Sequence, residues 1–129
     1  MKLLKCWFPL LIWILLIFGL SSIQDVSTEG IHLPDGSDKV IHYFEYSILA
    51  LLFYRGLIYE RWDINNTLYG FIVILGSGSI ALMDEFYQSF VPGRDASFFD
   101  LIADISGIIT GTVVYYIVRR NTMKKRKEL

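Results

Sequence analysis

The sequence has 129 residues, of which 53% are hydrophobic and 16% aromatic, and its formal net charge is −1. This length allows one domain, and the composition excludes an ordinary soluble one. A bilayer core of ~30 Å needs about 20 apolar residues per helix, and stretches of that kind take up most of the chain. The single cysteine, Cys6, excludes an intrachain disulfide framework and a thiolate metal cage.

The first apolar stretch predicts a transmembrane helix over about residues 6–23, after Lys2 and Lys5. A secretory signal peptide is the alternative, because Gly19 and Ser21 are small enough for a cleavage site. The length of the run favours a retained helix. Residues 24–38 are polar, acidic and interrupted by glycine and proline, which predicts a loop, and we assign no role to its His32.

Three further spans are predicted, at about residues 39–59, 67–86 and 98–119, and a basic tail follows at 119–129. The predicted fold is therefore all-α, a four-helix transmembrane bundle in which residues 1–129 form a single membrane domain. Ala103, Gly107 and Gly111 form a stripe of small residues on the last span. Such a stripe packs closely on another helix, either within the bundle or in a dimer, and the small size of the bundle favours internal packing.

The charges are segregated along the chain. The N-terminus, the turn near residue 60 and the tail hold 10 of the 12 lysines and arginines, whereas the other loops and span ends hold 10 of the 13 acids. An excess of lysine and arginine marks the cytoplasmic face, so both termini are predicted inside (N-in, C-in) and the acidic segments outside. The tail is interpreted as an orientation signal that attracts anionic lipid headgroups, and no nucleic-acid partner is expected.

Residues 84–104 place five acids between two apolar spans. Ionisable side chains inside or beside a span are costly and by default functional. Asp84 and Gln88 are four residues apart, as are Asp100 and Asp104, so each pair shares one helix face. Pro92-Gly93 predicts a turn that lets the two faces converge.

Helix capping is the competing interpretation of this stretch. Ser97 and Asp100 fit a capping box at the start of the last span. Capping does not explain Asp104, which lies one turn deeper. It does not explain Asp84 and Glu85 either, because acids are disfavoured near a helix C-terminus. We therefore favour a functional cluster.

The second span carries Asp38, His42, Glu45 and Tyr46 at positions i, i+4, i+7 and i+8, which lie on one helix face. So polar a face is expected to turn toward the bundle interior or a water-filled vestibule. In the predicted topology this span begins, the third ends and the fourth begins on the outer side. The sequence therefore predicts a polar pocket that opens outward.

Three chemistries suit these residues. In the first, His42 acts as acid and base with Asp84 and Glu85, and Arg94 binds an anionic group such as a phosphate. In the second, His42 and the carboxylates hold a divalent cation, with magnesium, calcium or manganese favoured over zinc. In the third, Arg94 and His42 only neutralise acids and lock the loop. The candidate substrate-binding residues are Asp38, Tyr46, Gln88, Arg94, Asp100 and Asp104.

Three motifs occur in order: Asp38-Lys39-x-x-His42-Tyr43-x-x-Tyr46, Asp84-Glu85-x-x-Gln88-x-x-Val91-Pro92-Gly93-Arg94, and Asp100-x-x-Ala103-Asp104-x-x-Gly107. By these motifs the chain resembles the VanZ-like family of small bacterial membrane proteins over about residues 5–118. The family usually has asparagine at the position of Asp104, and Glu45 lies outside its pattern. The resemblance implies a multi-pass protein of the bacterial cytoplasmic membrane with a role in the cell envelope. The founding member is associated with low-level resistance to the glycopeptide teicoplanin.

Two functions follow as hypotheses, and the sequence leaves open whether the protein is an enzyme. As a binding protein, it would engage a membrane lipid, a lipid-linked cell-wall precursor or a glycopeptide in the outer pocket. As an enzyme, it would be a membrane-embedded hydrolase or transferase acting on a phosphate-bearing lipid, with His42 as the base. A proton or ion pathway is disfavoured, because no acidic or basic group appears in the inner halves of the third and fourth spans before the terminal Arg119.

Overall fold

The computed structural model describes residues 2–23, 36–60, 64–93 and 97–127, and this part of the chain forms four α-helices. They are α1 (Lys2–Ser21), α2 (Ser37–Tyr59), α3 (Asn66–Gln88) and α4 (Phe98–Lys127). The predicted all-α class is confirmed. Most of the predicted loop at residues 24–38 lies outside the described residues.

Local signals fix the start of α3 and the turn that follows it. The Asn65 side chain accepts a hydrogen bond from the Leu68 backbone N–H at 2.8 Å, which caps α3. Gly93 has φ of +80°, a conformation that glycine adopts without the steric cost of a Cβ atom. The turn predicted at Pro92-Gly93 is therefore present.

The last helix is longer than the predicted span of 98–119. Ser97 Oγ accepts a hydrogen bond from the Phe99 N–H at 3.2 Å where α4 begins, and the helix continues through the basic segment to Lys127. Residues 119–127 contain no glycine or proline and are rich in lysine and arginine, which are good helix formers. The segment contains no helix-breaking residue. Its charges therefore end the apolar span but not the helix.

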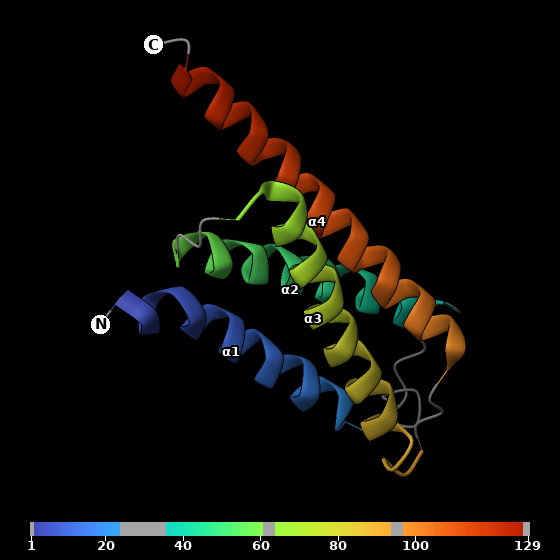
Figure 1. Ribbon diagram of the computed structural model, residues 1–129. Coiled ribbons are helices and arrows are strands. Elements are labelled where there is room, and N and C mark those ends of the chain that lie inside the picture. The colour runs from blue at the N-terminus through green and yellow to red at the C-terminus, as the bar shows by residue number, and fades with distance from the viewer. Residues whose placement is uncertain (1, 24–35, 61–63, 94–96, 128–129) are drawn as a thin grey trace.

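α2 is the central helix. It contacts each of the other three helices and packs most extensively along α4 (Figure 1). The end of α1, the start of α2, the end of α3 and the start of α4 all lie toward one end of the molecule, at the lower right in Figure 1. We call this the cluster end, because the polar motifs of the sequence lie on these helix ends.

Two glycines let α2 and α4 approach to backbone contact. A Cβ atom at Gly107 would collide with the carbonyl oxygen of Tyr43, and one at Gly111 with that of Ser47. The Ser47 hydroxyl also donates to the Gly107 carbonyl at 3.1 Å. The predicted stripe of small residues thus packs inside the bundle at these two positions.

Three helices, α1, α3 and α4, are long and apolar enough to cross a membrane. Their outer faces expose large apolar side chains such as Leu15, Leu75 and Phe98, as expected of surfaces in contact with hydrocarbon. These features indicate a multi-pass membrane protein. α2 is not among the three candidate spans, because it carries His42, Glu45 and Arg55. A fourth crossing at α2 and the N-in, C-in orientation stay predictions.

An aromatic group closes the opposite end of the bundle. The Tyr54 ring stacks on Tyr115 with centroids 4.8 Å apart, and the Arg119 guanidinium lies 4.9 Å from the centre of the Tyr69 ring. Between this group and the cluster end lies an apolar core. Its fully buried members include Ile17, Leu49, Ala50, Val73, Ala81 and Ile108.

Candidate functional site

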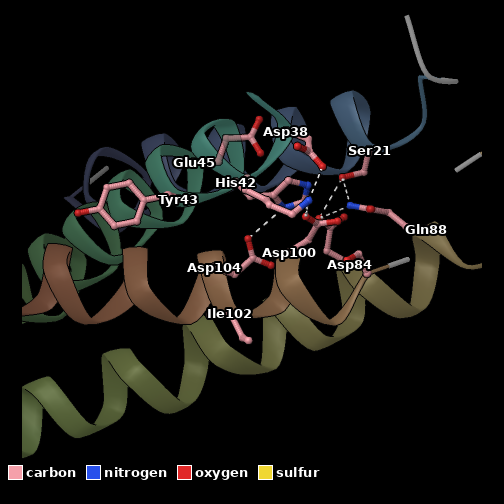
Figure 2. Close-up of polar contacts among 12 residues, drawn as sticks. Ser21, Asp38, His42, Tyr43, Glu45, Asp84, Gln88, Asp100, Ile102 and Asp104 are labelled. Carbon is pink, nitrogen blue, oxygen red and sulfur yellow. Dashed lines mark hydrogen bonds and ion pairs between the residues drawn. The ribbon is translucent and has the colours of Figure 1, made fainter. Parts of the chain in front are cut away.

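At the cluster end, α2 and α4 are joined by a buried histidine–carboxylate pair. His42 Nδ1 lies 3.0 Å from Asp104 Oδ1, although the two residues are 62 positions apart in the chain. Their exposed fractions are 3% and 0%. Figure 2 shows the His42 ring with the carboxylates of Asp84, Asp100 and Asp104 gathered on the side that faces α3 and α4. The predicted convergence of these motifs is therefore present.

A second set of hydrogen bonds joins α1 to α3. Asp84 Oδ2 accepts from Ser21 Oγ and from Gln88 Nε2, each at 3.0 Å, and Gln88 Nε2 lies 3.1 Å from Ser21 Oγ. All three residues are buried. Asp84 and Gln88 share one helix face, as their spacing predicts, and this face turns inward.

An ion pair joins the first turns of α2 and α4. Lys39 Nζ lies 3.1 Å from Asp100 Oδ1 and 2.8 Å from Asp38 Oδ2. Asp100 is buried, whereas the Asp38 side chain is 54% exposed. Hydrogen bonding to Lys39 lowers the pKa of the Asp38 carboxyl below its usual value. Lys39 thus bridges an exposed acid to a buried one.

The remaining carboxylate, Glu85, completes a group with His42 and Asp100. One potential ligand atom from each of the three residues lies within 4.8 Å of the others. Glu85 also interacts electrostatically with Asp84 and Asp104. We call the following residues the polar cluster: Ser21, Lys39, His42, Asp84, Glu85, Gln88, Asp100 and Asp104.

Several polar atoms of this region have no hydrogen-bond partner among the described residues, although they are shielded from solvent. They are Tyr46 Oη, Asp84 Oδ1, Glu85 Oε1, Asp100 Oδ1 and Asp104 Oδ2. Of these, Asp100 Oδ1 has the ion pair with Lys39, and the Tyr46 hydroxyl interacts with the Asp84 carboxylate. Buried polar atoms are normally satisfied, so an excess of unpaired acceptors in one place calls for a donor or a cation.

The structure places most of the predicted site residues in this cluster. Tyr46 is buried one turn beyond His42 on α2, and Asp38 lies at the exposed rim. Glu45 is buried, and its backbone carbonyl accepts from Trp13 Nε1 at 2.9 Å. Arg94 lies outside the described residues. The outward-opening pocket stays a prediction, since Asp84 and Asp104 have no exposed surface.

Two cluster members were not predicted as site residues. Ser21 was considered only as a small residue at a cleavage site, although its place at the outer end of the first span put it level with the acids. Lys39 is one of only two cations predicted on the outer side. A lysine among so many acids is a signal that could have identified it as an ion-pair partner.

The family model described as VanZ/LLP1 matches residues 6–119. The chain belongs to the VanZ-like family. Searches of curated proteins and of solved structures found no match. The three VanZ-like motifs lie on α2, α3 and α4, and their polar residues meet in the polar cluster.

The departure from the VanZ-like pattern falls at the centre of the site. Asp104, the position at which the resemblance leads us to expect asparagine, is the partner of His42. An asparagine amide oxygen can accept the same hydrogen bond from the imidazole N–H. The replacement therefore preserves the bond and adds a buried ionisable group.

Proposed function

We propose that this VanZ-like protein acts in the cell envelope by binding a membrane lipid or a lipid-linked cell-wall precursor at the polar cluster, on the extracytoplasmic side of the membrane. By doing so it would lower sensitivity to teicoplanin, in the manner associated with the founding member of the family. The supporting observation is the set of buried carboxylate oxygens without hydrogen-bond partners at the cluster end. Ionisable groups kept in such surroundings are usually functional.

The chemistry of the cluster limits the ligand. Among the described residues of the cluster, carboxyl groups outnumber the two basic groups, Lys39 and His42, so a ligand with a phosphate headgroup would need donor groups or a cation beside it. A ligand that brings amine, amide or hydroxyl donors would satisfy the unpaired acceptors. Exposed aromatic side chains flank the cluster on α3, on the turn that follows it and on α4, where Phe86, Phe90, Phe98 and Phe99 are each more than 60% exposed. Such a surface suits the hydrocarbon part of an amphiphile.

The experiment expresses the protein in a glycopeptide-sensitive bacterium and compares the inhibitory concentrations of teicoplanin and vancomycin. We expect the parent chain to raise the value for teicoplanin, and Asp84→Asn to lose the effect at equal protein level. The control is Ser79→Ala, whose exposed hydroxyl bonds only within α3, and it should act like the parent. Unchanged sensitivity on expression, with no lipid detected by mass spectrometry of the purified protein, would exclude the proposal.

One observation favours a second candidate, a hydrolase or transferase acting on a phosphate-bearing lipid. The His42–Asp104 pair has the geometry in which a carboxylate orients an imidazole for proton transfer. Purified protein would be incubated with undecaprenyl pyrophosphate or phospholipid, and phosphate release followed for the parent and His42→Ala. Release by the parent alone supports catalysis, whereas equal release by both, or none, excludes it.

A further inference from the structure

The spacing of three side chains within the polar cluster matches a cation site. Ligand atoms of His42, Glu85 and Asp100 lie within 4.8 Å of one another, and the three residues come from α2, α3 and α4. Oxygen ligands of calcium lie ~2.3–2.6 Å from the ion, so ligands on opposite sides of it are about 4.6–5.2 Å apart. The observed limit is comparable with that distance.

A second observation points to a positively charged occupant. Asp84 and Asp104 have no exposed surface. Asp104 Oδ2 has no hydrogen-bond partner among the described residues, whereas the Asp84 carboxylate interacts with the Tyr46 hydroxyl as well as with Ser21 and Gln88. Both carboxylates interact electrostatically with Glu85. Lys39 is the cation placed against the group, and it reaches Asp100. The four carboxyl groups of Asp84, Glu85, Asp100 and Asp104 therefore outnumber the two basic groups among the described residues of the cluster, Lys39 and His42.

The hydrogen bond of His42 to Asp104 leaves its other ring nitrogen for a ligand. In the tautomer that donates from Nδ1 to Asp104, the other ring nitrogen, Nε2, keeps its lone pair. Histidines that bind metals commonly donate their second ring N–H to a carboxylate, which fixes the ring and raises its basicity. Asp104 fills this position. The family's usual asparagine would accept the same bond without the charge.

We propose that His42, Glu85 and Asp100 bind one divalent cation, with Asp104 as the positioning residue for the His42 ring. Two carboxylates beside one imidazole favour manganese, magnesium or calcium over zinc, because hard oxygen ligands predominate. The cation links three helices at the cluster end. This inference does not depend on which envelope ligand the protein binds.

The test uses the full chain purified in detergent, stripped with a chelator and titrated with Mn²⁺, with bound ion followed by electron paramagnetic resonance. We expect one ion per parent chain and at least tenfold weaker binding for Glu85→Gln and Asp100→Asn. Asp104→Asn should weaken binding less than these two, because its amide oxygen still orients His42. Glu60→Gln is the control, since this acid lies at the opposite end and bonds Trp7, and its binding should equal that of the parent.

Circular dichroism separates lost binding from lost folding, and added Mn²⁺ should raise the unfolding temperature of the parent but not of Glu85→Gln. No binding at millimolar Mn²⁺ by the folded parent would overturn the proposal. Equal binding by parent, Glu85→Gln and Asp100→Asn would also overturn it. No lipid or antibiotic enters the assay, so failure here leaves the proposed function to its own experiment.

Discussion

Replacing Gly107 by alanine tests the packing that brings the α2 and α4 motifs together. The added methyl group would meet the Tyr43 carbonyl oxygen and lie 3.1 Å from the Ser47 backbone nitrogen. Both are main-chain atoms inside a helix and cannot rotate away, so the helices must separate. Overpacking of this kind costs about 1–3 kcal/mol, and we expect the upper end, ~3 kcal/mol.

Alanine also favours the helix over glycine by about 1 kcal/mol, so the expected net loss is ~2 kcal/mol. Gly78→Ala is the matched control, because a Cβ atom there has no neighbour within 4 Å. The gain in helix propensity is common to both variants. The difference between their unfolding free energies therefore gives the cost of the clash, which we expect to be ~3 kcal/mol.

The assay is reversible unfolding in mixed micelles by titration with SDS, followed by circular dichroism. It gives the free energy of unfolding of the parent chain, Gly107→Ala and Gly78→Ala under one set of conditions. Equal unfolding free energies for the two variants would refute the close α2–α4 contact. The close α2–α4 packing that brings His42 to Asp104 would then be refuted as well.

Three further predictions concern other contacts. Gly76→Ala should cost only ~1 kcal/mol in the same titration, because its methyl group meets the Phe53 ring, which can turn aside; a loss as large as that of Gly107→Ala would contradict this. Ser21→Ala removes one hydrogen bond to the buried Asp84 carboxylate and should lower the unfolding free energy by about 1.5–3 kcal/mol, whereas an unchanged value would place Ser21 outside the cluster. Trp7→Phe loses the 2.8 Å hydrogen bond to Glu60 and should lower the unfolding free energy by about 1 kcal/mol. Glu60→Gln keeps Trp7 and an acceptor oxygen, so its unfolding free energy should be closer to that of the parent.

The helices of this protein were predictable because apolar runs of bilayer length occur between polar segments. Spacing of four residues predicted the shared faces of Asp84 with Gln88 and of Asp100 with Asp104. The extension of α4 to Lys127 was not predicted. Hydropathy shows where the apolar span ends, whereas the end of the helix depends on the helix propensities of the residues that follow.

The partners inside the site were harder to predict than its members. Spacing along one helix says which side chains share a face, but the choice of Asp104 as the partner of His42 depends on how closely α2 and α4 approach. The glycines at 107 and 111 set that approach, and their sequence signature left internal packing and dimerisation both open. Ser21 was missed because a single hydroxyl carries little signal until its neighbours are known.

The 62-residue separation between His42 and Asp104 has a consequence for biosynthesis. At roughly 5–20 residues per second, a ribosome needs about 3–12 s to reach the aspartate after it has made the histidine. During that interval the His42 side chain has no α4 to pair with. The buried pair that joins α2 to α4 can therefore form only after most of the chain has been made.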